Sequence, residues 1–185
     1  MAAITLPDRL VLVRHAWAGE RTADPQLDRR RPLDEEGRRQ AERLPGQLRD
    51  VLGPDPAAIR LLSSPLTRCV DTLRPLADTL GRELMTDEQL AEVAVPLHAS
   101  DGWPDAAWYA ARALQAIDAA APSTGTLVVC SHGEILPALL AALAGHLDVE
   151  LPDDIDLTAK AMPKGGAWLV ASDGFAVTAI APPHA

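Results

Sequence analysis

Aromatic residues, cysteines and long apolar runs are all scarce in this sequence, and each scarcity excludes a class of protein. Phe, Tyr and Trp make up 3% of the 185 residues, which favours Ala, Leu and Val packed between helices and a sheet over an aromatic-rich all-β core. Two cysteines, Cys69 and Cys130, form no disulfide framework and indicate buried thiols. The longest apolar run, Ile135–Gly145, contains Pro137 and is too short to span a bilayer, so we expect no membrane association.

Positive charge is also in deficit. The chain carries a net charge of −9, and its pI is about 4.9. A general nucleic-acid binder shows the opposite balance, so we expect no nucleic-acid partner. The first ten residues show no basic segment followed by a long apolar run, so we expect no signal peptide and a cytoplasmic protein. An anionic substrate would require the few cations to be concentrated at one site.

Short apolar runs alternate with helical patterns along the chain. These runs predict buried strands at Leu10–Val13, Ile59–Leu62 and Thr126–Cys130. A weaker pattern predicts a further strand, third in chain order, at Glu83–Thr86. Helices are predicted from an N-cap at Asp34 to about Gly53, from Pro65 to Leu80, over Trp103–Ala121 and over Glu134–Ala144. Residues 16–31 and 89–102 read as loops, and Pro45 predicts a kink or an early break in its helix.

The alternation of strands and helices predicts the fold class. We expect one domain over residues 1–185, an α/β three-layer α/β/α sandwich whose mostly parallel sheet has helices on both faces. Asp173–Gly174 between Ala167–Ser172 and Phe175–Ile180 predicts a hairpin at one edge. The oligomeric state is not predicted by any pattern in the sequence.

Polar residues follow three of the predicted strands. The first strand ends in Arg14 and His15, the second in Ser63–Pro65 with Arg68 soon after, and the buried strand Thr126–Cys130 in Ser131–Gly133. Because the carboxyl ends of parallel strands meet in one crevice, two arginines and two histidines are expected together there.

Two arginines and two imidazoles suit a phosphoryl group. Guanidinium groups bind phosphate oxygens through paired hydrogen bonds, and an imidazole can attack phosphorus and form a covalent intermediate. The second imidazole, if cationic, would stabilise the charge of the transition state. The cluster supplies its own positive charge, so we expect no metal and no cofactor.

The residues resemble a known family. LVLVRH (residues 10–15), RPLDEEGRRQA (31–41), SSPLTRCVDT (63–72) and VVCSHG (128–133) are similar to signature segments of the histidine phosphatase superfamily, with the phosphoglycerate-mutase-like fold. Within it, the similarity is greatest to small bacterial phosphohistidine phosphatases and to phosphatase domains that follow a Nudix domain. The KGGAW segment (164–168) resembles a tail motif of the latter, whereas Ala16 departs from the usual Arg-His-Gly.

The resemblance implies a role for each position. His15 would be the nucleophile, Arg14 and Arg68 would hold the phosphate, and His132 would be the second imidazole. Glu92 would be the general acid, with Glu88 as the alternative.

Other positions are left open. Ser64 is expected either to touch the phosphate or to cap a helix, Arg21 to contact phosphate or substrate, and Lys164 to lie at the pocket rim or simply at the surface. Trp17, Trp103 and Trp108 would line a base-stacking pocket or, for the two helical ones, pack in the core.

The resemblance implies a metal-independent phosphatase acting on a small phosphorylated metabolite or nucleotide through a covalent phosphohistidine. Three alternatives stay open: a phosphatase for phosphohistidine proteins, a mutase, and a non-catalytic phosphate-binding module. The short chain argues against a mutase, and the complete Arg/His set argues against a silent module.

Overall fold

The fold is built around a six-stranded sheet, seen in a computed structural model that describes residues 4–93, 103–158, 162–171 and 176–180. The strands run in the order β3-β2-β4-β1-β5-β6. Their bounds are Arg9–Arg14 (β1), Ile59–Ser63 (β2), Leu84–Thr86 (β3), Thr126–Ser131 (β4), Ala167–Ala171 (β5) and Ala176–Ile180 (β6). The first four are parallel, and β5 and β6 form an antiparallel hairpin at the edge. The predicted fold class is confirmed, although Asp173–Gly174 lies outside the described residues.

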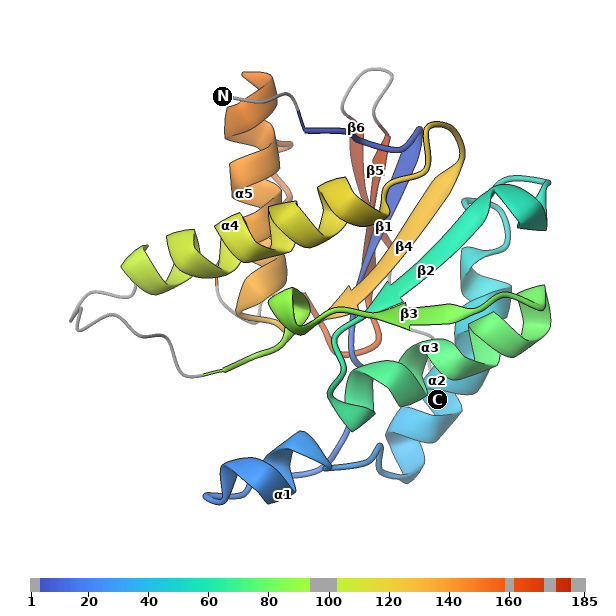
Figure 1. The fold of residues 1–185 in the computed structure, drawn as a ribbon, viewed down its shortest axis with the longest axis vertical. Helices are drawn as coiled ribbons and strands as arrows, with labels where there is room; N and C mark the ends of the chain where they lie inside the picture. Colours follow the sequence, from blue (N-terminus) through green and yellow to red (C-terminus); the bar gives the residue numbers. More distant parts are fainter. Residues whose placement is uncertain (1–3, 94–102, 159–161, 172–175, 181–185) are drawn as a thin grey trace.

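Helices cover both faces of this sheet (Figure 1). Their bounds are Pro25–Arg29 (α1), Glu35–Leu48 (α2), Thr67–Leu80 (α3), Trp103–Ala120 (α4) and Ile135–Leu147 (α5), with 3-10 turns at Pro56–Ala58 (η1) and Glu88–Leu90 (η2). Helices α2 and α3 pack on one face and α4 and α5 on the other, whereas α1 lies past the carboxyl ends of the parallel strands (Figure 1). No helix within the described ranges is long and apolar enough to cross a membrane.

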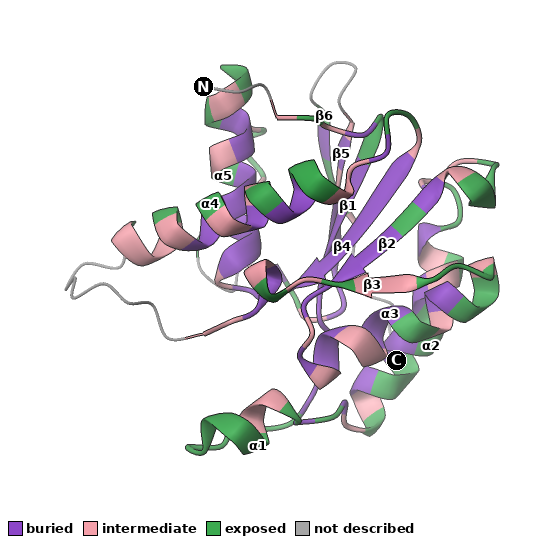
Figure 2. Cartoon of the chain, in the orientation of Figure 1, coloured by how far each residue is buried: buried purple, intermediate pink, exposed green. Residues whose placement is uncertain are grey.

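The two central strands are buried on both faces, as their continuous apolar sequence predicts (Figure 2). In β1, Leu10 and Leu12 belong to the core beneath α4 and α5. Val11 and Val13 belong to the core beneath α2 and α3. Each fully buried Leu or Val contributes about 1.5–3 kcal/mol of hydrophobic free energy, so both helix layers anchor the strand that carries Arg14 and His15.

Three local predictions are wrong. The loop after β1 contains α1, because Asp24 caps its first turn by accepting from the N–H groups of Gln26 and Leu27. Helix α2 continues through Pro45 without the predicted early break, because its buried face holds it against α3, and it ends at Leu48 rather than near Gly53. Pro65 lies before α3 rather than in its first turn.

The helical tryptophans differ in their surroundings. Trp103 is 70% exposed, so its predicted core position is wrong. Trp108 packs partly buried against the core, and Arg112 stacks over its ring with the guanidinium carbon 4.4 Å from the centroid. Trp103 is the first residue of α4.

The segment after His15 is fastened to the start of α2. Asp34 donates its backbone N–H to the Trp17 carbonyl over 3.1 Å, and Asp34 Oδ1 accepts from Gly37 N over 2.8 Å. The close approach requires glycine at position 37, because a Cβ there would lie 1.8 Å from the Trp17 carbonyl oxygen.

Replacing Gly37 with alanine is expected to destabilise the fold by about 1–3 kcal/mol, because backbone must move to admit the methyl group. Gly46 is the matched control: it is exposed on the same helix with nothing near its Cβ position. Gly46→Ala is expected to stabilise the helix by about 0.5–1 kcal/mol. Urea unfolding measures both, and equal free energies for the two variants would contradict the packing at Gly37.

Candidate active site

The ends of three strands converge, as the sequence predicts. In the β1–β4 pairing Arg14 lies opposite Ser131, and His15 donates its backbone N–H to the Ser131 carbonyl over 3.0 Å. Ser64 at the end of β2 donates to the Cys130 carbonyl over 2.9 Å. The ring centroids of His15 and His132 are consequently 5.4 Å apart.

The backbone fixes the ring of His15. Its Nδ1 lies 2.8 Å from the Ala16 carbonyl oxygen, and because a carbonyl only accepts, Nδ1 carries the proton and Nε2 keeps its lone pair. The Ala16 N–H in turn donates to Thr72 Oγ1 on α3 over 2.9 Å. Burial lowers the pKa of His15 to about 3, opposed by the bond to Ala16 and reinforced by Arg68 and Arg14. His15 is therefore neutral at pH 7.

Arg14 lies across the turn that follows β4. Its guanidinium donates to the Met162 carbonyl and packs on Gly133, where a Cβ would come within 2.8 Å of Arg14 Nε. Burial lowers the pKa of Arg14, and Glu134 opposes that effect. The glycine after His132 thus leaves the space that the guanidinium fills.

Arg68, in the first turn of α3, is almost fully buried, with 1% of its side chain exposed. One nitrogen donates to the Asp28 carbonyl over 3.0 Å, and Nη2 lies 3.3 Å from Glu92 Oε2. Its Nε has no hydrogen-bond partner among the described residues. A buried donor without a partner costs free energy, which a hydrogen-bond acceptor placed next to this atom would recover.

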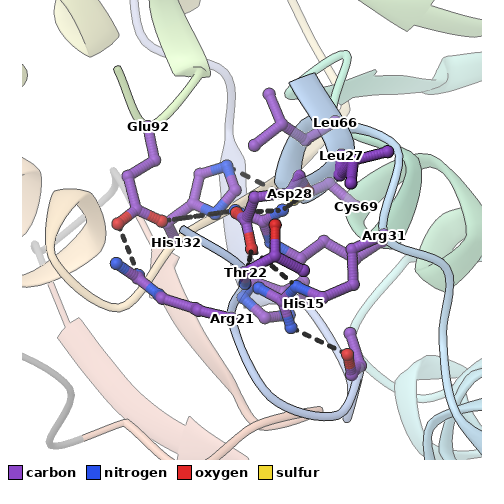
Figure 3. Close-up of polar contacts among 12 residues, drawn as sticks. His15, Arg21, Thr22, Leu27, Asp28, Arg31, Leu66, Cys69, Glu92 and His132 are labelled. Carbon is purple, nitrogen blue, oxygen red and sulfur yellow. Dashed lines mark hydrogen bonds and ion pairs between the residues drawn. The ribbon is translucent and has the colours of Figure 1, made fainter. Parts of the chain in front are cut away.

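Glu92 joins the same cluster from the other side (Figure 3). Its carboxylate pairs with Arg21 and lies 3.5 Å from His132 Nδ1. Turn η2 holds it there, because Ser131 Oγ donates to the Leu90 carbonyl over 2.9 Å. Glu88 instead forms a surface pair with Arg29 and is 62% exposed. Of the two candidate acids, Glu92 is the one beside the histidines.

His132 is completely buried, and its Nε2 lies 2.9 Å from Ser64 Oγ. Burial, with the nearby His15 and Arg68, lowers the pKa of His132 well below its usual value. Both imidazoles are thus neutral in the free protein. Of the two expected roles of Ser64, the helix cap is wrong, because α3 has Leu66 as its N-cap with no side-chain cap. Its contact with phosphate stays a prediction, and its hydroxyl lies against His132.

A cavity of about 180 Å³ opens beside His15. It is lined by Arg14, His15, Gly19, Arg21, Arg31, Glu134 and Lys164. The sequence predicts that Arg21 contacts phosphate or substrate and that Lys164 lies at the pocket rim or at the surface, and both line this cavity. Arg31 and Glu134 also line the cavity, although neither is predicted as a site residue from the sequence. Their positions gave a signal, because Arg31 begins the RPLDEEGRRQA segment and Glu134 directly follows Gly133. Within the described ranges, no group of His, Cys, Asp and Glu is arranged to hold a metal ion.

Comparison with known proteins places these residues in a family. Residues 10–100, which carry Arg14, His15, Arg68 and Glu92, match the model of the histidine phosphatase superfamily (branch 1). The chain belongs to the histidine phosphatase superfamily.

One protein is similar to it in sequence, and two solved structures are similar to it in fold. The 8-oxo-(d)GTP phosphatase of Mycolicibacterium smegmatis is 34% identical over 131 residues, and the match covers 71% of this chain but only 36% of that protein. A candidate phosphohistidine phosphatase, SixA, from Agrobacterium tumefaciens has TM-score 0.62 at 20% identity, over 97% of this chain and 99% of that one. A mycobacterial glucosyl-3-phosphoglycerate phosphatase has TM-score 0.63 at 20% identity, over 96% and 100%. These two structures share the fold.

The low pKa of His15 predicts how stability depends on pH. Because the unfolded chain binds a proton on this residue below about pH 6.5 and the folded one only near pH 3, acid favours unfolding between those values. His15→Asn should make the free energy of unfolding fall less steeply from pH 6.5 to 4.5, by up to about 1.4 kcal/mol per pH unit. Denaturant unfolding at several pH values tests this, and parallel pH profiles for both proteins would contradict it.

Proposed function

We propose that this protein is a metal-independent phosphatase that transfers phosphate to His15 and then to water, acting on a small phosphorylated metabolite or nucleotide. The observation that carries the proposal is the state of His15. Its Nδ1 proton is held by the Ala16 carbonyl, its pKa is low, and it lines a cavity shared with Arg14. A neutral, oriented imidazole among guanidinium groups is an activated nucleophile for phosphorus.

In the first step, His15 Nε2 attacks phosphorus and the N–P bond forms as the bond to the leaving oxygen breaks. Arg14 and Arg68 bind the non-bridging oxygens, where charge accumulates. Glu92, in its protonated form, donates a proton to the leaving oxygen, which departs as an alcohol or a phosphate.

In the second step, water attacks the phosphohistidine from the side that the leaving group has vacated. The Glu92 carboxylate accepts the proton of that water, the N–P bond breaks, and His15 regains its lone pair. Two in-line displacements give net retention at phosphorus. Inversion with a chiral phosphate substrate would exclude the covalent intermediate.

His132 would change its charge during the cycle. It is neutral in the free protein because burial and the neighbouring cations disfavour the proton. A bound phosphate places negative charge against the ring and favours the protonated form, which then donates to a phosphate oxygen. Ser64 keeps the ring in the orientation that this donation requires.

The phosphatase is tested by phosphate release with chelator present, for wild type and His15→Ala. The substrates are an aryl phosphate, nucleoside di- and triphosphates, sugar phosphates and a phosphohistidine peptide. We expect release that survives chelation and falls at least about 10³-fold in the variant, because the nucleophile is absent. Release that continues in His15→Ala would exclude His15 as nucleophile, and no release by the folded wild type would favour a binding module.

Replacing Glu92 distinguishes a phosphatase for small metabolites from a phosphatase for phosphohistidine proteins. An alkoxide leaving group needs a proton, so Glu92→Gln is expected to lower kcat on a sugar phosphate by about 10²–10⁴-fold. A phosphohistidine peptide releases an imidazole, which needs less help, and should be little affected. Glu88→Gln is the matched control, because that carboxylate is exposed and paired with Arg29. Equal losses in the two variants would remove Glu92 from the acid role.

A further inference from the structure

Lys164 stands apart from the other cations of the cavity. Arg31 is paired with Asp28 over 2.9 Å, and Arg21 with Glu92 and Glu134. By contrast, no carboxylate among the described residues lies within ion-pair distance of the Lys164 ammonium. That ammonium lies 4.0 Å from the centroid of the Trp17 ring. Among the described residues, its charge is thus in contact with an aromatic face and not with a paired carboxylate.

The surroundings disfavour that charge. Burial lowers the pKa of Lys164, and so do Arg14, Arg31 and Arg21, against a smaller opposing effect of Asp34. A half-buried ammonium among like charges is unfavourable unless a ligand compensates it. The hydrogen-bonded backbone beside Lys164 keeps this ammonium close to the neighbouring cations.

The turn that carries Lys164 is fixed to the nucleophile's own strand. The Gly165 N–H donates to the Arg14 carbonyl over 3.1 Å and to the His15 carbonyl over 3.3 Å. Arg14 N donates to the Gly166 carbonyl over 3.0 Å. The backbone that carries Lys164 is thus held next to the end of β1, which suits a group that binds substrate beside His15.

Lys164 shares its cavity with His15 but not with the proposed general acid. The lining of the cavity includes Lys164, Arg31, Arg14 and His15, and Lys164 acts electrostatically on His15. Glu92 instead lines a separate hollow beside Tyr109. A group at Lys164 therefore faces the same space as the nucleophile without belonging to the proton-transfer pair.

We propose that Lys164 binds a second anionic group of the substrate, next to the phosphoryl group that His15 attacks. This inference rests on the proposed phosphatase and narrows its substrate class. Arg14, Arg68 and the two imidazoles suffice for one phosphoryl group, so an additional unpaired cation in a cavity of this size selects for more negative charge. A diphosphate meets that need through its second phosphate, and a phosphorylated carboxylic acid through its carboxylate.

Binding to His15→Ala tests the inference without relying on turnover. The probes are inorganic phosphate, methylenediphosphonate and phosphonoacetate, measured by calorimetry. We expect methylenediphosphonate to bind about tenfold or more tightly than phosphate, since a second charge-assisted contact is gained. The added change Lys164→Met should remove that advantage, and Lys164→Arg should keep most of it. Phosphonoacetate as tight as methylenediphosphonate supports a carboxylate as the second anion, whereas weaker binding supports a diphosphate.

The matched control is Arg49→Gln. Arg49 is an exposed cation at the end of α2 and does not line the cavity, so this substitution removes the same charge elsewhere on the protein. It should leave all three affinities as they are in His15→Ala. The inference is overturned if methylenediphosphonate binds no tighter than phosphate, or if Lys164→Met weakens both equally. Either result leaves the phosphatase proposal intact, since that proposal depends on phosphate release and on His15.

Discussion

The parallel pairing of β1 with β4 is the constraint on which the rest of the site depends. Its register sets Arg14 opposite Ser131, so that the next residue of each strand is a histidine. Each strand is buried on both faces, and slipping the pair by one residue would move every core side chain to the wrong layer. The hydrophobic core therefore fixes the distance between His15 and His132 more firmly than any contact within the site. Arg68 and Glu92 reach the same edge because β2 and η2 bond to β4.

An acidic protein that concentrates its cations at this edge must stabilise them before substrate arrives. Asp28, Glu92 and Glu134 do so for Arg31, Arg68 and Arg21, and backbone carbonyls do so for Arg14. The guanidinium groups are consequently held in place in the free state, which lowers the reorganisation needed to bind a phosphoryl group. The two imidazoles differ from the guanidinium groups, because burial lowers their pKa values and keeps both rings neutral. In the proposed mechanism, His15 is therefore able to attack phosphorus and His132 to gain a proton when the anion binds.

How much the sequence predicts depends on whether a feature is local. Continuous apolar runs predicted the central strands, and the polar residues at their ends predicted which groups meet, because parallel topology alone brings them together. The contacts of Arg31 and Glu134 depend on side-chain directions that no spacing encodes. Helix α1 is not predicted by the sequence pattern, because it is capped by Asp24 and buries no apolar face. Tertiary context also overrides local preference at two residues. Pro45 is held inside a helix that proline disfavours, and Trp103 lies outside the core although its side chain is apolar.

Glu92 and Lys164 are positioned by different segments of the chain. Glu92 is positioned through η2 and β4, whereas the turn that carries Lys164 is bonded to the end of β1 through Gly165. Under the proposed function, a substitution of Lys164 would therefore alter which substrate is bound without displacing Glu92. Two solved structures share this fold at 20% identity and have different substrates in their names, so the fold alone does not determine the substrate. In the proposed phosphatase, selection among substrates would depend on groups such as Lys164 at the cavity rather than on the strands that place His15.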